Sequence, residues 1–112
     1  MAGSHLVADF LAKNEANALE LRTLMEKIVE RLGLHVVQYW TQAFPNGGEF
    51  GPGITAMMIL SESHFVIHTA PERQSVNLDL FSCRTFDDWI VRRAIEELFD
   101  VTHWARWVVL SR

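Results

Sequence analysis

The sequence predicts a single α+β domain, a two-layer sandwich in which a largely antiparallel sheet carries two helices on one face. Short runs that are apolar, or alternate apolar with polar residues, occur at 54–60, 65–69 and 76–83, and none contains proline. The links between them are too short for a crossover helix, so these strands must be antiparallel neighbours. Two longer segments, at about 14–32 and from residue 85 onward, repeat apolar residues at helical spacing.

The chain begins with an expected strand at residues 5–11, followed by a helix that continues to about residue 32. Asn14 or a neighbouring residue can cap this helix, and Gly33 follows it as a C-terminal stop. Apolar residues recur on one face of the helix at Leu21, Leu24, Met25, Ile28 and Leu32. This stripe indicates packing against a core rather than a cofactor-binding surface.

A second strand is expected at residues 35–44, which are rich in valine and aromatic residues. Residues 45–53 then form a loop rich in glycine and proline. This loop lacks the Lys-Ser or Lys-Thr of a phosphate-binding loop, so we do not interpret it as a nucleotide site. Its position before the central hairpin makes it a candidate lip of an active site.

The central strands are joined by Ser61-Glu62-Ser63-His64, which is an unusual sequence for a hairpin turn. It contains no Asn-Gly or Gly-Gly, which a relaxed two-residue turn prefers. A turn whose residues do not suit its geometry can hold strain, and strain at a hydroxyl-bearing residue can serve chemistry. A plain hairpin with a polar tip is the alternative interpretation.

The register of this hairpin places two polar side chains together. If residues 61–62 form the turn, counting outward puts Thr55 opposite His68, with Cβ atoms roughly 4.5–5.5 Å apart. A hydroxyl and an imidazole would then be neighbours in an otherwise apolar ladder. His64 and His68 share one face of their strand, because they are separated by an even number of residues. A hydrogen-bonded core histidine is the alternative.

The run at 76–83 is connected to the hairpin by a loop that contains Pro71. If this loop closes a second hairpin, the end of the run returns to the first turn, and Cys83 lies near Ser63.

The remaining elements are a second helix and a last strand. Thr85 is expected to begin the helix, with Asp88 three residues later in the spacing of a capping box. Its apolar face would consist of Phe86, Trp89, Ile90, Ala94 and Leu98. Residues 103–110, with two tryptophans and several aliphatic residues, predict the last strand.

Length and composition narrow the class of protein. A chain of 112 residues is expected to form one domain over residues 1–112, and its net charge of −4 without a basic cluster argues against a nucleic-acid partner. No apolar run is long enough to span a membrane and no signal peptide is evident, which predicts a cytoplasmic protein. One cysteine cannot form an internal disulfide. The hydrophobic fraction of 49% leaves apolar surface to cover and favours a homodimer.

Four segments, in order and at consistent spacing, resemble the core of the small bacterial and archaeal S-adenosylmethionine decarboxylases. They are residues 5–10, Ser61-Glu62-Ser63-His64, His68-Thr69 with Pro71-Glu72, and Asp79-Leu80-Phe81-Ser82-Cys83. Each is weak alone, but the combination spans most of the chain. The resemblance implies an S-adenosylmethionine decarboxylase-like fold and a pyruvoyl-dependent carboxy-lyase of polyamine (spermidine) biosynthesis.

The resemblance also implies that the chain is a zymogen that cleaves itself. The Ser63 hydroxyl would attack the carbonyl of Glu62, which turns an amide into an ester, and elimination would break the chain between these two residues. Ser63 would become a pyruvoyl group, which forms a Schiff base with the substrate amine and takes the place of pyridoxal phosphate as electron sink. The cleaved protomers would stay together through their shared sheet, and no metal is expected.

Further roles follow from the resemblance, position by position. His68 matches the histidine that takes the Cα proton during elimination. Thr55 stands where the family usually has serine, and its hydroxyl would help to stabilise the ester-forming intermediate. Cys83 matches the cysteine that returns a proton to the decarboxylated carbon. Glu72 matches a carboxylate that faces the substrate, although a solvated loop charge is the alternative.

Ala70 departs from the family pattern, which commonly has tryptophan after His68-Thr69. An aromatic residue there can stack on adenine, an interaction worth roughly 1–3 kcal/mol in nucleic-acid complexes. Phe50 is a candidate to stack instead. S-adenosylmethionine is therefore the first expectation for the substrate, and L-ornithine or L-arginine, which relatives decarboxylate, are the alternative. Glu72 or Glu49 would then face the distal cation.

Two other classes of function remain open. The chain can be a non-catalytic, dimeric binding or regulatory relative, which would stay uncut. A metal site could be built from His5, His35, His64, His68 and His103. No His-Glu-x-x-His or Cys-x-x-Cys spacing favours such a site.

Overall fold

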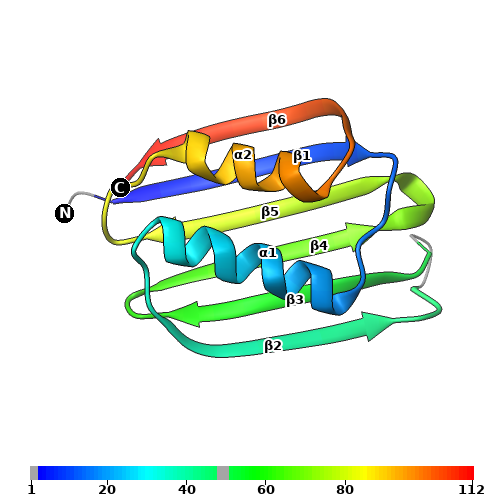
Figure 1. The fold of residues 1–112 in the computed structure, drawn as a ribbon, viewed down its shortest axis with the longest axis horizontal. Coiled ribbons are helices and arrows are strands. Elements are labelled where there is room, and N and C mark those ends of the chain that lie inside the picture. The colour runs from blue at the N-terminus through cyan, green and yellow to red at the C-terminus, as the bar shows by residue number, and fades with distance from the viewer. Residues whose placement is uncertain (1–2, 48–50) are drawn as a thin grey trace.

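The computed structural model describes residues 3–47 and 51–112 and has the predicted two-layer α+β architecture (Figure 1). One sheet has the strand order β2-β3-β4-β5-β1-β6, and all neighbouring strands in it are antiparallel. The strands are β1 (Ser4–Ala12), β2 (Val36–Phe44), β3 (Gly53–Leu60), β4 (Ser63–Ala70), β5 (Ser75–Ser82) and β6 (Val101–Ser111).

Two helices, α1 (Ala18–Arg31) and α2 (Asp88–Leu98), lie on the same face of the sheet (Figure 1). Helix α1 covers the half that contains β2, β3 and β4, and α2 covers the half with β1 and β6. The core lies between the two layers. Its largest fully buried side chains include Leu6, Phe10, Leu21, Met25, Ile28, Met58, Phe65, Ile67, Leu80 and Ile95.

Helix α1 is capped by Asn17 rather than by Asn14. The Asn17 side chain accepts a hydrogen bond from the backbone of Glu20, and the Glu20 carboxylate accepts one from the backbone of Asn17, which makes a capping box. Asn14 instead donates to the carbonyl of Leu98, at the far end of α2. The predicted stop is confirmed, because Gly33 has a φ of +70°, in the left-handed region that glycine adopts most easily.

The predicted start of α2 is wrong. The helix begins at Asp88, and Asp87 is its N-cap, with a side chain that accepts from the backbone of Trp89. The reason is tertiary, because the backbone N–H of Phe86 donates to the Ser4 hydroxyl at 3.4 Å and the segment before Asp87 stays outside the helix.

The expected apolar face of α2 is also shifted. Val91, Ala94 and Ile95 are its buried residues. Trp89 is 55% exposed and lies beside the guanidinium of Arg92. Ala94 is buried as predicted, and Phe86 and Leu98 pack partly buried against the core, but Val91 and Ile95 take the buried positions expected for Trp89 and Ile90.

The β3–β4 hairpin has the predicted register, with Thr55 opposite His68. A single turn of 3-10 helix, η2 (Pro71–Arg73), forms in the loop before β5. The strand bounds differ from those expected by one or two residues at most ends, and β6 begins at Val101 rather than at residue 103.

The sheet face opposite the helices, here called the open face, carries the side chains that alternate with the buried ones along each strand. It includes Ile59, His64, His68, Asp79 and Val108. No helix covers this face in the part of the chain that the structure describes. Within the same part, neither helix is long and apolar enough to cross a bilayer.

Candidate active site

The turn between β3 and β4 holds a backbone conformation that its residues do not favour. Ser61 and Glu62 form the two-residue link, so that Leu60 pairs with Ser63. Glu62 has a φ of +60°, in the left-handed region that costs a residue with a Cβ about 1–2 kcal/mol. The backbone N–H of Ser61 donates to the carbonyl of His35 at 3.0 Å, which ties the turn to the start of β2. The sequence prediction of strain at this turn is therefore confirmed.

Cys83 contacts both sides of the peptide bond between Glu62 and Ser63. Its thiol donates to the Glu62 carbonyl oxygen at 2.7 Å, and its backbone N–H donates to Ser63 Oγ at 3.3 Å. Cys83 follows β5, which confirms the prediction that the end of this strand returns to the turn. A donor on a carbonyl oxygen draws electron density from the carbonyl carbon and makes that carbon a better target for a nucleophile.

Thr55 and His68 form a second polar pair, in the middle of the β3–β4 ladder. Thr55 Oγ1 lies 2.8 Å from His68 Nδ1, as the predicted register requires. Asn77 is the neighbour of His68 on β5, and its amide donates to Asp9. The bond to Thr55 holds one ring nitrogen of the imidazole and leaves Nε2 to act as an acid or base.

The structure does not bring these two pairs together within one chain. His68 lies five residues after Ser63 on β4, which corresponds to about 16 Å of extended strand. Ser63 also has the strand parity of the buried Phe65 and Ile67, whereas His68 projects from the open face. Ser63 with Cys83 and Thr55 with His68 are therefore two separate half-sites.

A hollow of about 700 Å³ opens beside Thr55 and His68. Ala70 and residues 43–47 also line it. This volume is in the range of small-molecule sites. Because Ala70 has only a methyl group, the wall at this position leaves space where a tryptophan would stand.

The predicted substrate-binding residues are only partly within the described structure. Phe50 and Glu49 lie outside the described residues. Glu72 is exposed in η2, and its carboxylate lies against the backbone at Gly51. Its side chain is not part of the wall of the hollow.

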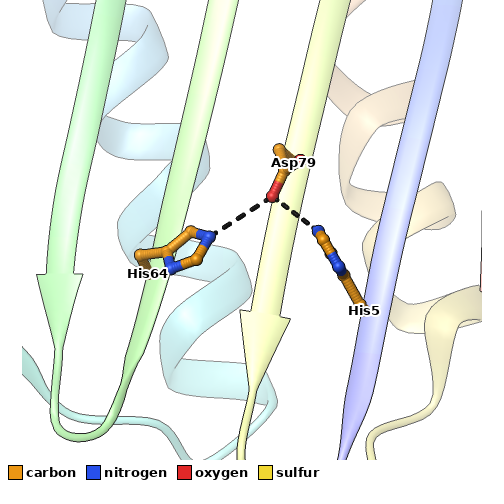
Figure 2. A group of neighbouring side chains, drawn as sticks. All are labelled: His5, His64 and Asp79. Carbon is orange, nitrogen blue, oxygen red and sulfur yellow. Dashed lines mark hydrogen bonds and ion pairs between the residues drawn. The ribbon is translucent and has the colours of Figure 1, made fainter. Parts of the chain in front are cut away.

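Sequence reasoning named His5 and His64 only among five histidines of a possible metal site, and it did not place them with Asp79 on the open face. His5 and His64 both approach the carboxylate of Asp79, each from a neighbouring strand (Figure 2). Strand alternation predicts that each of these side chains points to the open face. That the three lie next to one another depends on the pairing of β1 with β5, and no local sequence pattern reveals that pairing.

Comparison with known proteins identifies similar chains. A family model described as S-adenosylmethionine decarboxylase matches residues 4–110. The S-adenosylmethionine decarboxylase proenzyme of Archaeoglobus fulgidus is 34% identical over 87 residues, which cover 74% of this chain and 72% of that protein. The proenzyme of Caldicellulosiruptor saccharolyticus is 31% identical over 104 residues, which cover 90% of this chain and 81% of that protein.

A solved structure shares the fold. The crystal structure of the adenosylmethionine decarboxylase from Aquifex aeolicus aligns with a TM-score of 0.69 at 23% identity. The alignment covers 99% of this chain and 88% of that one.

Proposed function

Because the chain belongs to the S-adenosylmethionine decarboxylase family, we propose that it decarboxylates S-adenosylmethionine in polyamine biosynthesis and makes its own pyruvoyl group from Ser63. A pyruvoyl group supplies an electron sink that accepts the electron pair released as carbon dioxide leaves. The group needs no metal and no diffusible cofactor, so the chain's own residues must form it, hold it and move the protons.

One observation supports self-cleavage most strongly. The scissile bond would join Glu62, which is held at positive φ, to Ser63, whose hydroxyl is fixed by Cys83. The carbonyl to be attacked accepts a hydrogen bond from the Cys83 thiol. Strain in the starting conformation and a donor on the carbonyl oxygen both lower the barrier to attack.

The cleavage reaction follows from the atoms present. Attack of Ser63 Oγ on the carbonyl carbon of Glu62 forms an ester bond and breaks the amide bond. Removal of the Ser63 Cα proton then breaks the Cβ–Oγ bond, so that Glu62 leaves as a carboxylate. Hydrolysis of the dehydroalanine that remains consumes one water and releases ammonia, which leaves the pyruvoyl group at the new amino end.

His68 is the base that takes the Cα proton, and Thr55 holds its ring. The 2.8 Å contact between Thr55 Oγ1 and His68 Nδ1 fixes the imidazole plane and leaves Nε2 available. The threonine methyl restricts χ1, so the hydroxyl keeps one direction. The roughly 16 Å between His68 and Ser63 along β4 means that these residues must meet across two chains.

A homodimer would complete the site. If the Thr55–His68 half-site of one protomer faces the Ser63–Cys83 half-site of its partner, all four groups converge twice in a two-fold dimer. The open face has the apolar surface that such an interface needs, because Ile59, Val108 and Leu110 are 48%, 41% and 48% exposed. Cys83, beside the pyruvoyl position, would then return the proton to the decarboxylated carbon.

The hollow beside Thr55 and His68 is the proposed substrate site. The names of the matched relatives favour S-adenosylmethionine. Ala70 offers no aromatic ring to stack on adenine. S-adenosylmethionine would therefore need other groups to hold its adenine, whereas the linear alternatives L-ornithine and L-arginine need no such ring. Glu72, which the hollow's wall does not include, is a candidate carboxylate for the distal cation of such a linear substrate.

Two measurements test the proposal. Intact mass of the purified protein is expected to show fragments that end at Glu62 and begin at Ser63, with the second blocked at its amino end. A carbon dioxide release assay with the three substrates at equal concentration is expected to favour S-adenosylmethionine. An uncut chain would identify a non-catalytic relative. Turnover of ornithine or arginine alone would contradict S-adenosylmethionine as the substrate, although self-cleavage would still hold.

The variant Ala70→Trp probes the substrate further. It is expected to tighten the binding of an adenosyl group and to block the binding of a linear amino acid.

A further inference from the structure

On the open face, the side chains of two histidines and one aspartate point toward one another (Figure 2). His5 Nε2 lies 2.8 Å from Asp79 Oδ1, and His64 Nε2 lies 3.5 Å from the same oxygen. One ligand atom from each of the three residues lies within 4.8 Å of the other two. Three side chains distant in sequence therefore direct nitrogen and oxygen donors toward one position.

The sheet itself creates this arrangement. His5 on β1 and His64 on β4 are both directly opposite Phe81 of β5, and Asp79 precedes Phe81 by two residues on the same face. The two imidazoles also contact the Phe81 ring, with centroids 5.9 Å and 5.5 Å away. Rigid strands and a shared aromatic neighbour fix the direction of the donors before any ligand arrives.

We propose that His5, His64 and Asp79 bind one divalent transition-metal ion of the zinc class. Two imidazole nitrogens and one carboxylate oxygen are a donor set that Zn²⁺ takes with three protein ligands and an open position. Ligands at about 2.1 Å in a tetrahedral arrangement lie about 3.4 Å apart, so small side-chain rotations convert the present separations. Histidine nitrogens disfavour Mg²⁺ and Ca²⁺, which prefer oxygen.

In the single chain the open position lies on the sheet face away from the helices, and in the proposed dimer it would face the partner's sheet. His64 and Asp79 are 51% and 44% exposed, whereas His5 is 17% exposed and is the anchored member. A depression of about 430 Å³ on the open face includes His64, Asp79 and His68, which leaves room beside the three ligands for an ion and its fourth ligand. The site is independent of cleavage at Ser63, because none of its ligands takes part in that reaction.

Arg112 is the cation nearest to the group. Its guanidinium donates to His5 Nδ1 at 3.4 Å, which leaves the proton of His5 on Nε2, toward Asp79. A metal ion bound at His5 Nε2 takes the place of the proton on that nitrogen. The neutral imidazole then carries its proton on Nδ1, and the 3.4 Å contact with Arg112 is lost.

Calorimetric titration of the purified, metal-stripped protein without a polyhistidine tag tests this site. Zn²⁺ is expected to bind at one ion per chain, and Mg²⁺ is expected not to bind. His64→Ala and Asp79→Asn are expected to weaken Zn²⁺ binding at least about tenfold, since even the loss of an outer partner costs a metal site that much. His64 is half exposed at a strand surface, so its variant keeps the fold even where His5→Ala does not.

Two matched variants serve as controls. Asp9→Asn removes a carboxylate from the same face, where it contacts Asn77 and Arg106, and His103→Ala removes a histidine from β6. Both are expected to bind Zn²⁺ within about twofold of the wild type. Absence of Zn²⁺ binding to the wild type, or equal binding by His64→Ala and Asp79→Asn, would overturn the site. A thiolate-to-metal charge-transfer band with Co²⁺ would also overturn it, because the ion would then be at Cys83.

Discussion

The two half-sites of this protein differ in how the fold holds them. The Ser63–Cys83 half-site is built on a turn with a left-handed Glu62, and its contacts run through the backbone of the bond to be broken. The Thr55–His68 half-site is a side-chain pair within a regular ladder and carries no backbone strain. Of the two half-sites, the strained one contains the bond that is proposed to break, whereas the proposed base lies in a regular strand.

The difference also explains why both half-sites lie on one strand without forming a site in one chain. A strand is stiff, and it alternates its side chains between two faces. Ser63 and His68 are therefore kept apart in distance and in direction by β4 itself. The proposed dimer uses the same stiffness, because each strand presents its base at a fixed distance from its own turn.

The largest expected effect belongs to the strained half-site. Ser63→Ala removes the nucleophile, so the chain is expected to stay uncut and to have no detectable decarboxylase activity. It should fold, because a small residue at the start of β4 is exchanged for a slightly smaller one. Gel electrophoresis and intact mass measure the cleavage, and circular dichroism measures the fold. Cleavage of this variant at the wild-type rate would show that Ser63 is not the nucleophile.

Cys83→Ala is expected to separate cleavage from turnover. Loss of the thiol donor on the Glu62 carbonyl should slow cleavage about fivefold, the equivalent of a neutral hydrogen bond, while the backbone contact to Ser63 remains. Decarboxylation should fall about 100-fold or more, as expected for removal of a general acid. Cys83→Ser, which keeps a donor, should cleave faster than the alanine variant. If Cys83→Ala decarboxylates its substrate at the wild-type rate over many cycles, Cys83 is a packing residue and not the proton donor.

The relaxed half-site is expected to respond more gently. Thr55→Val keeps the shape but removes the hydroxyl from His68 Nδ1, so cleavage should slow about tenfold as the imidazole loses its fixed direction. Thr55→Ser restores the hydroxyl and should recover most of the rate. The rate of chain cleavage in the two variants measures the contribution of this contact. Equal rates for valine and serine would show that Thr55 does not orient the base.

The smallest effect is expected far from both half-sites. Hydrogen bonds from Arg31 and Lys27 lower the pKa of Glu97 from 4.5 to about 2 and link α1 to α2. A depressed pKa adds stability above the unfolded value of 4.5, and that stability is lost as pH falls toward 2. Glu97→Gln should therefore lower the melting temperature slightly at pH 7 and less at pH 3, with cleavage unchanged. Glu96→Gln, at the neighbouring exposed glutamate, is the control. An equal fall in melting temperature in this variant would show that the contacts of Glu97 with Arg31 and Lys27 are not the cause.

Local patterns predicted the parts of the site that lie close in sequence. The pairing of Thr55 with His68 followed from a two-residue link and strand alternation, because these fix the register. The start of α2 was missed, because Thr85 and Asp87 are both good caps and the contact from Phe86 to Ser4 decides between them. The group at His5, His64 and Asp79 was also missed, because it depends on strands that pair across the whole chain.

The separation of the two half-sites could not be predicted from the motifs either. The resemblance assigned roles to Ser63 and His68 without a distance between them. The roughly 16 Å of strand between these residues is the reason for proposing that a second chain completes the site. The dimer predicted from the composition would therefore serve to bring Ser63 of one chain to His68 of the other.

The most direct test mixes two inactive chains. Ser63→Ala and His68→Ala are co-expressed at equal levels, with a tag that distinguishes their masses. Each alone is expected to stay uncut. In a mixed dimer the intact His68 of one chain faces the intact Ser63 of the other, so about half of the His68→Ala chains should be cleaved under random pairing. Decarboxylase activity should return to about one quarter of the wild-type value by the same pairing. If the His68→Ala chain stays uncut in the mixture, the half-sites do not meet across two chains.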